Sequence, residues 1–390
     1  MQLRLGSLFS GFGGLDRAIE RVFDARTVWV SDIEPGPCKV LAHRFPGVPN
    51  LGDITQIDWS TVEPVDIIAG GSPCQDISSA GRMAGMREGT RSNLWVEMRE
   101  AIATLRPALV TWENVSAARS TAAASAMESD PGLLGDHPAG VPPLRALGRV
   151  LGDLASLGYD AQWYSLRAAD VGAPHGRLRY FILAADTRGK SWLQRRLTTP
   201  GQAPQRWPLG ELTGRDRAPV GLLPTPAACN PNDGEGPETW LARRERVKLT
   251  ANNGNGMGMP LGIAVQLMPT TSVADTQGGR KSRSGARSGE LLLNGIADQQ
   301  AWEPYAAAIA RWEQIVGPAP SPTKLGKKGR PKLNPAFAEW MMGAAPGWIT
   351  DVPGVTDNEA LQMVGNGVVQ QQAETALRIM ADRFAQWSTP

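Results

Sequence analysis

The chain has few cysteines and no long apolar run, and both absences narrow the classes of protein to which it can belong. Its 390 residues include three cysteines, Cys38, Cys74 and Cys229. Three widely separated thiols exclude a disulfide framework and give no closely spaced ligand set, so we predict no metal site. No apolar run approaches the roughly 20 residues that cross a bilayer, and the first residues lack the basic-then-apolar pattern of a secretory signal. These absences favour a cytoplasmic protein, in which a lone thiol is free for chemistry.

Positive charge is concentrated in the middle of the chain, although the formal net charge is only +2. Residues 186–332 contain 21 Lys and Arg against 12 Asp and Glu, a balance of +9, which leaves −7 for the rest of the chain. A basic segment between acidic flanks favours contact with a polyanion. A solvated basic surface is the ordinary alternative.

Residues 1–185 alternate between short apolar strands and amphipathic helices. Strands are predicted over 3–8, 27–31, 65–69, 108–112, 161–166 and 179–184, and helices over 15–23, 37–44 and 94–105. This alternation predicts a doubly wound α/β sheet of the Rossmann-like class. Such sheets bind ligands beyond the carboxyl ends of their strands. Asp32, Cys74 and Glu113 all follow predicted strand ends.

The remainder of the chain has a different texture. Between residues 186 and 332 regular periodicity gives way to Pro, Gly, Asn and Arg, apart from one helix predicted over 302–316. Regular structure returns after residue 333, with an amphipathic helix predicted over 373–387. We therefore predict three segments: a catalytic and cofactor-binding domain over 1–185, a smaller loop-rich domain over 186–332, and a C-terminal segment over 333–390 that packs back on the first domain.

A glycine-rich turn, Phe9–Gly14, lies between the first predicted strand and the first predicted helix. Glycines let a ligand approach the backbone, and the start of the helix offers unpaired N–H groups. Such a turn is also an ordinary strand–helix connection. Asp32 strengthens the functional interpretation, because an acidic residue at the end of the next strand binds ribose hydroxyls in nucleotide-binding sheets. Asp53 is suited to an adenine amino group and Ile54 to the adenine ring.

Three further motifs contain groups suited to chemistry on a base. Pro73 stiffens the loop that holds Cys74, and a cysteine beyond a strand end and near a helix start is suited to act as a nucleophile. Glu113 is suited to act as an acid or a hydrogen-bond partner. Arg177 and Arg179 alternate at the start of a strand, so we expect them to point together at an anion or a carbonyl group. Taken singly, each motif has an ordinary structural explanation.

In this order, the motifs resemble those of the cytosine-C5 DNA methyltransferases. The resemblance covers about 1–115, 160–185 and 333–380. It is carried by Phe9–Gly14, Pro73-Cys74-Gln75, Glu113-Asn114-Val115 and Gly365-Asn366-Gly367-Val368. It implies S-adenosyl-L-methionine as the cofactor. The residues that the resemblance places at the cofactor are Phe9, Ser10, Gly11, Gly13, Gly14, Asp32, Ile33, Asp53, Ile54, Pro73, Leu94, Asn366 and Val368.

The resemblance also implies a mechanism and a substrate. Cys74 would add to C6 of a cytosine flipped out of duplex DNA, Glu113 would contact N3, and Arg179, helped by Arg177, would contact O2. The middle segment would recognise the target sequence, which cannot be read from the chain. Its candidates for phosphate contacts are Arg243–Lys248, Arg280–Arg287 and Lys324–Lys332. Two positions depart from the family pattern: His175 stands where Gln is usual, and Asp32-Ile33 where many members have Glu and an aromatic residue.

Three alternatives remain open at this point. The same chemistry is known on RNA, and a catalytically silent DNA-binding homologue would keep the fold. A Rossmann oxidoreductase is disfavoured, because Phe9–Gly14 lacks the Gly-x-Gly-x-x-Gly spacing. The absence of a long N-terminal regulatory region favours a bacterial or phage protein. We expect a monomer that needs no protein partner, with a cognate restriction endonuclease as a possible companion.

Overall fold

The structure is a computed structural model, and two compact units make up the chain. The first unit contains residues 1–167, 178–207 and 370–390, and the second contains 168–177 and 208–369. These units are divided differently from the three predicted segments: the chain already enters the second unit at residue 168, and it returns to the first only at residue 370. The structure describes residues 2–72, 94–115, 146–189, 222–227, 235–250, 258–267, 303–326 and 331–386.

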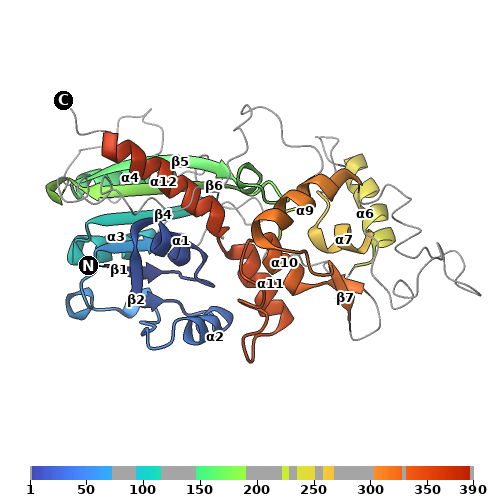
Figure 1. The fold of residues 1–390 in the computed structure, drawn as a ribbon, viewed down its shortest axis with the longest axis horizontal. Coiled ribbons are helices and arrows are strands. Elements are labelled where there is room, and N and C mark those ends of the chain that lie inside the picture. The colour runs from blue at the N-terminus through green and yellow to red at the C-terminus, as the bar shows by residue number, and fades with distance from the viewer. Residues whose placement is uncertain are drawn as a thin grey trace, which may run out of the picture. The chain divides into compact units, whose positions relative to one another are not determined.

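A six-stranded sheet forms the centre of the first unit, with the strand order β2-β1-β3-β4-β6-β5 (Figure 1). Strands β2, β1, β3 and β4 are parallel, whereas β6 runs antiparallel to both β4 and β5. Each of the six predicted strands is present, which confirms the doubly wound α/β fold. The strands are β1 (Leu3–Leu8), β2 (Ala25–Ser31), β3 (Ile67–Gly70), β4 (Leu109–Val115), β5 (Tyr159–Arg167) and β6 (Leu178–Asp186).

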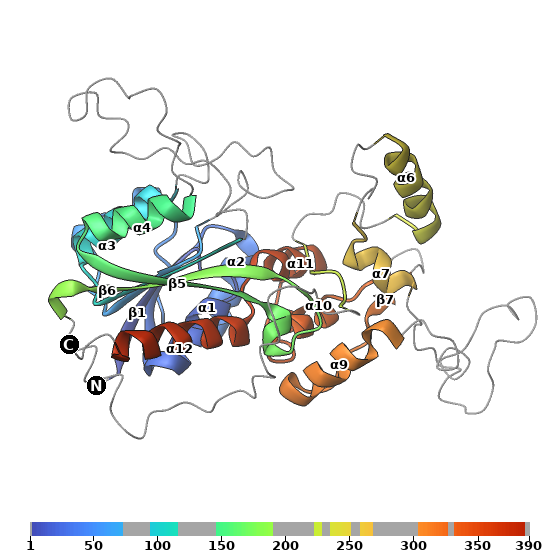
Figure 2. The same ribbon diagram turned by 90° about the horizontal axis from the view of Figure 1, so that it is seen from above.

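Helices cover both faces of this sheet. Figure 2 shows α3 and α4 on one face and α1 and α12 on the opposite face. α1 buries Leu15, Ala18 and Ile19 at helical spacing, which gives the helix one apolar side for the sheet. The helices of this unit are α1 (Gly14–Phe23), α2 (Pro35–Arg44), α3 (Leu94–Leu105), α4 (Ala146–Ser156) and α12 (Gln370–Gln386).

Buried tryptophans fix the strands relative to one another on the α3 side of the sheet. The rings of Trp29 and Trp59 lie 5.9 Å apart, and Trp95 meets Trp112 edge-on at 6.1 Å. The indole of Trp29 lies against Gly6, where an added Cβ would come within 2.0 Å of the ring. A side chain on that residue of β1 would therefore displace the tryptophan. This packing holds β1, β2 and β4 in register, and with them the residues that follow each strand.

The second unit is mostly helical and has its own core. Trp312 donates its indole N–H to the carbonyl of Trp340 at 2.9 Å, and Trp340 donates to the carbonyl of Gly317 at 2.8 Å. The Glu339 carboxylate beside them accepts from the Thr350 hydroxyl at 2.7 Å, and burial raises the pKa of this carboxyl group. The elements are α6 (Pro237–Thr250), α7 (Leu261–Leu267), α9 (Glu303–Val316), β7 (Thr323–Leu325), β8 (Pro331–Leu333), α10 (Pro335–Met341) and α11 (Asp357–Asn366).

Two searches of the described residues gave a negative result. No helix among them is long and apolar enough to span a membrane. Within the same residues, no three His, Cys, Asp or Glu side chains are grouped as the ligands of a metal ion would be.

Candidate active site

The register of the parallel strands brings the predicted motifs into one row. Leu8 at the end of β1 pairs with Ser31 on β2 and with Gly70 on β3, and Gly70 pairs with Trp112 on β4. The strand order reverses between β1 and β3, which is the switch point where doubly wound sheets bind ligands. The residues that follow these four along the chain are Phe9, Asp32, Gly71 and Glu113.

The glycine-rich turn after β1 adopts backbone conformations that favour glycine. Gly11 has a φ of +57° and Gly13 a φ of +84°. A Cβ on Gly11 would meet nothing within 4 Å, whereas one on Gly13 would lie 2.8 Å from the ring of Phe45. The amide of Gly11 donates to Oδ2 of Asp32 at 2.9 Å. Gly11 therefore leaves open space beside the Asp32 carboxylate, and Gly13 lets α1 start at Gly14 against a packed ring.

An asparagine that the sequence analysis overlooked joins two of the predicted cofactor motifs. Oδ1 of Asn50 accepts from the amides of Asp32 and Gly52, each at 3.1 Å. Nδ2 of Asn50 donates to the carbonyl of Asp32 at 3.0 Å and to Sγ of Cys38 at 3.3 Å. Burial raises the pKa of the Asp32 carboxyl group, although this residue is still partly open to solvent. Asn50 thus fixes Asp32 relative to the turn that contains Asp53.

The remaining predicted cofactor residues of the first unit differ in exposure. Ile33 is 63% exposed, and Asp53 caps a short 3-10 turn by accepting from the amide of Thr55 at 3.0 Å. Ile54 is buried in the hydrophobic core, and Leu94 packs against the same core at the start of α3. Ile33 and Asp53 therefore have the solvent access that a ligand contact needs. Pro73 lies outside the described residues.

Glu113 and Arg179 form a buried ion pair across two strands. β4 continues to Val115, so Glu113 lies inside the strand and not after it, as the sequence predicted; the pairing with β6 extends the strand to Val115 and Arg179. Glu113 lies opposite Phe181, which makes Arg179 its diagonal neighbour on the same face of the sheet. Nε of Arg179 is 3.0 Å from Oε1 of Glu113, and the two side chains are only 14% and 9% exposed.

The two residues that lead into the Pro-Cys loop are fixed on β4. Trp112 donates its indole N–H to Oγ of Ser72 at 3.1 Å, and Asn114 donates to the carbonyl of Ser72 at 3.2 Å. A Cβ on Gly71 would lie 3.1 Å from Oε2 of Glu113, so this glycine lets the chain pass close to the carboxylate. Asn114 belongs to a predicted motif but had no predicted role. Cys74 lies outside the described residues.

Arg177 does not take part in the strand alternation that the sequence predicted. β6 begins at Leu178, and Arg177 has a φ of +24°, so the two arginines do not follow one another at alternate positions of a strand. The guanidinium of Arg177 is buried and donates to the carbonyl of Gly365 at 2.9 Å and to that of Gly367. It therefore holds the turn around Asn366 within the second unit.

Replacing Arg177 by alanine should destabilise the second unit by about 3 kcal/mol, because buried carbonyl oxygens lose their donor. Urea unfolding of the purified protein measures this change. Arg188→Ala is the matched control, since Arg188 is 67% exposed and its ion pair with Asp186 is worth little. Equal stability of the two variants would contradict a clamping role for Arg177.

Asn366 and Val368 differ in their surroundings within the second unit. Asn366 is exposed at the end of α11, whereas Val368 is only 8% exposed. His175, which stands where the family usually has Gln, is fully buried, and its Nε2 lies 3.0 Å from the carbonyl oxygen of Met341. The imidazole ring is thus used within the core of the second unit. That Asn366 and Val368 contact the cofactor stays a prediction.

Cys38 offers a comparison for the predicted nucleophile. Burial raises the pKa of its thiol, and the nearby Asp32 carboxylate raises it further. The thiol donates to the carbonyl of Asp32 at 3.3 Å. This cysteine is therefore held as a neutral thiol among the residues of the second strand end. Cys229 lies outside the described residues.

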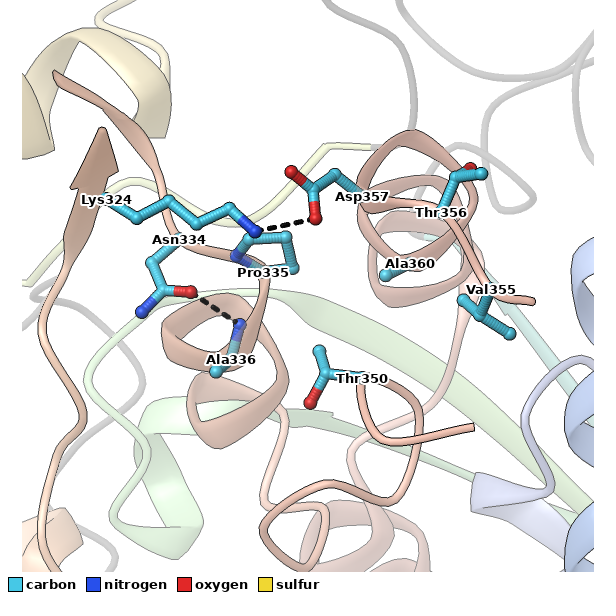
Figure 3. A pocket seen from close by; sticks show the side chains of 9 residues that line it. All are labelled: Lys324, Asn334, Pro335, Ala336, Thr350, Val355, Thr356, Asp357 and Ala360. Atoms are coloured by element: carbon cyan, nitrogen blue, oxygen red, sulfur yellow. Dashed lines mark hydrogen bonds and ion pairs between the residues drawn. The ribbon is translucent and has the colours of Figure 1, made fainter. Parts of the chain in front are cut away.

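Several lysines and arginines of the basic middle segment are paired with acidic side chains. Nζ of Lys324 lies 2.6 Å from Oδ1 of Asp357, and Nζ of Lys332 lies 2.5 Å from Oδ2. Figure 3 shows Lys324 reaching toward Asp357 at a cavity of about 90 Å³ between the start of α10 and α11. On α6, Arg243 pairs with Glu235. The predicted stretch at 280–287 lies outside the described residues.

The strand order and the row of motifs define a doubly wound domain with a ligand-binding edge at β1 and β3. A family model described as C-5 cytosine-specific DNA methylase matches residues 3–378. The chain therefore belongs to this family, as its motifs predict. The methyl donor of the family is S-adenosyl-L-methionine, which confirms the predicted cofactor.

Individual relatives match parts of the chain. Type II methyltransferase M.NlaIV of Neisseria lactamica is 30% identical over 190 residues, which cover 46% of this chain and 41% of that protein. DNA N-6-adenine-methyltransferase of Escherichia phage P1 is 36% identical over 133 residues, or 31% of this chain and 18% of that protein. The solved structure of Spodoptera frugiperda DNMT2 aligns with 97% of this chain and 99% of its own, at 16% identity and a TM-score of 0.48. The chain spans about two fifths of the length of M.NlaIV.

Proposed function

We propose that the protein transfers a methyl group from S-adenosyl-L-methionine to C5 of a cytosine flipped out of duplex DNA, through a covalent bond between Cys74 and C6. The observation that carries the proposal is the buried ion pair of Glu113 and Arg179 beside the start of the Pro73-Cys74 loop. Family membership supplies the reaction class, and this pair supplies a pocket for the base.

The pair matches the edge of cytosine that carries O2 and N3. A guanidinium donates to the O2 carbonyl, and a carboxyl group interacts with N3. Ser72 is held on β4, next to Glu113, and Cys74 follows two residues later. Two residues of extended chain reach about 7 Å, so the thiol has to lie in the neighbourhood of the carboxylate. These constraints support a single site for the base and its nucleophile.

The residues at the switch point fit the methyl donor. Gly11 leaves the backbone open, Asp32 presents a carboxylate at the adjacent strand end, and Ile33 and Asp53 are exposed nearby. When bound, S-adenosyl-L-methionine supplies a methyl group on a positively charged sulfur. Asp32 would bind its ribose, and Asp53 and Ile33 its adenine. In the second unit, Asn366 would add a polar contact.

The chemistry follows from the roles of three side chains. Arg179 orients the base through O2, and the Cys74 thiolate adds to C6, so that a C–S bond forms and electron density moves to C5 and N3. Glu113 stabilises that density by hydrogen-bonding or protonating N3. C5 then takes the methyl group. Loss of the C5 proton and breakage of the Cys74–C6 bond restore the aromatic ring and release the thiolate.

Duplex DNA is the proposed substrate, because the middle segment is strongly basic. Removing one base from the stack costs a few kcal/mol, which pocket and phosphate contacts offset. Lys324 and Lys332 are candidates for phosphate contacts, although each is already paired with Asp357. We place the recognition of the target sequence in residues 186–332. The proposed form in solution is a monomer.

A methylation assay with purified protein and labelled cofactor tests the substrate. We expect the label in duplex DNA and not in transfer RNA, with 5-methylcytosine as the product after digestion to nucleosides. N6-methyladenine, the product that the name of the phage P1 relative implies for that protein, should be absent. Transfer to RNA alone would establish the rival substrate, and no transfer to either would favour a silent homologue.

A further inference from the structure

A buried carboxyl group lies directly beneath the glycine-rich turn and has no role in the proposed chemistry. Asp16 occupies the first turn of α1 and is 1% exposed. Its side chain points back toward the turn: a Cβ on Gly13 would lie 3.7 Å from Oδ2 of Asp16. The Ser7 hydroxyl on β1 is its polar partner. No other side chain in the described part of the chain donates a hydrogen bond to it.

Hydroxyl groups connect this carboxyl group to the turn. Oγ of Ser10, which belongs to the turn, donates to Oγ of Ser7 at 2.8 Å. Ser7 in turn faces Asp16, and all three side chains are at most 9% exposed. Asp16, Ser7 and Ser10 thus form a hydroxyl relay from the helix to the turn. A change of charge on Asp16 would reorient both hydroxyls, because each can donate or accept.

The charged groups around Asp16 disfavour its ionised form. Glu20 on the same helix and Asp32 beyond β2 both repel a second carboxylate. From α12, which packs on α1, Glu374 is already paired with Arg21 and Arg378. No ion pair to Asp16 occurs among the described residues. Together with burial, which is the largest influence, this repulsion raises the pKa of Asp16 to about 7.

We propose that Asp16 is a positioning residue for the cofactor, which acts through the hydroxyl relay and loses its proton when the cofactor binds at the turn. The proposal rests on the proposed function, which places the positively charged S-adenosyl-L-methionine at Phe9–Gly14. A cation there stabilises the carboxylate form of Asp16. By linkage, the carboxylate form binds the cation more tightly, so affinity should rise with pH through neutrality.

Isothermal titration of S-adenosyl-L-methionine between pH 5.5 and 8.5 tests this coupling. Wild-type affinity should rise roughly tenfold between pH 6 and pH 8, as a shift of about one pKa unit on binding requires. Asp16→Asn should bind with an affinity that no longer changes over this range. Asp32→Asn is the matched control: it should bind more weakly but keep the pH dependence, because Asp16 is intact.

Ser7→Ala separates the relay from the charge. This variant retains the Asp16 carboxyl group, so its unfolding free energy should still depend on pH near neutrality, whereas its cofactor affinity should not. A wild-type pH dependence of affinity in Asp16→Asn or in Ser7→Ala would overturn the proposal. Cofactor binding by the wild type without any pH dependence would overturn it too. Absence of binding at every pH would instead overturn the proposed function, and this inference with it.

Discussion

Cys74→Ser is expected to abolish methyl transfer while leaving the affinity for S-adenosyl-L-methionine close to that of the wild type. A serine hydroxyl is almost fully protonated at neutral pH, and no base is proposed to activate it, so addition to C6 fails. The cofactor contacts proposed on β1 and β2 are untouched by the change. We expect a loss of activity of at least about 10⁴-fold, measured by transfer of labelled methyl groups to DNA.

Cys38→Ser provides the control for this experiment. Cys38 is a neutral thiol that donates a hydrogen bond to the carbonyl of Asp32, and a serine hydroxyl preserves a donor there. Its activity should stay within about tenfold of the wild type, since one weak hydrogen bond changes by about 1 kcal/mol. Normal turnover by Cys74→Ser would sink the covalent mechanism.

Glu113→Gln should lower kcat by roughly 10²–10⁴-fold, which is the range for removal of a positioned acid–base group. The amide is nearly isosteric, so the loop at Gly71 keeps its space, but glutamine has no proton to transfer to N3 and no charge for Arg179. The defect should appear in kcat more than in KM for DNA, because the lost interaction is strongest in the transition state.

Asp186→Asn is the matched control for the loss of a buried acidic partner in the same sheet. Asp186 lies at the other end of β6, is 8% exposed, and pairs with Arg106 and Arg188. Its replacement should lower the stability of the protein and leave kcat nearly unchanged. A kcat for Glu113→Gln as high as that of Asp186→Asn would show that the carboxyl group is a structural residue only.

The sequence predicts the first unit well because its signals are local. Buried parallel strands are short apolar runs, and the residue after each run is read directly. Asp32 and the Gly71-Ser72 start of the catalytic loop lie where this reasoning places them. Glu113 is the exception, since its strand is prolonged by pairing with β6, whose residues follow more than 60 positions later.

The features that the sequence did not predict depend on distant contacts. Arg177 is bonded to a carbonyl 188 residues further along the chain, so no local pattern distinguishes it from Arg179. Asn50 gains its role from the backbone of Asp32. α6 carries mostly charged residues and little apolar periodicity, which is why a helix was not predicted over 237–250. The target sequence is unreadable for the same reason, because base recognition depends on where side chains are placed.

The most direct test of the account is bisulfite sequencing of DNA from cells that express the wild-type protein, with Cys74→Ser as the paired sample. The account predicts cytosines protected from conversion at one recurrent sequence in the wild-type sample, and none in the variant. That sequence would also be the target read by residues 186–332. Complete conversion of cytosines in both samples, although the wild-type protein is folded and binds S-adenosyl-L-methionine, would contradict the assignment of a DNA cytosine-C5 methyltransferase.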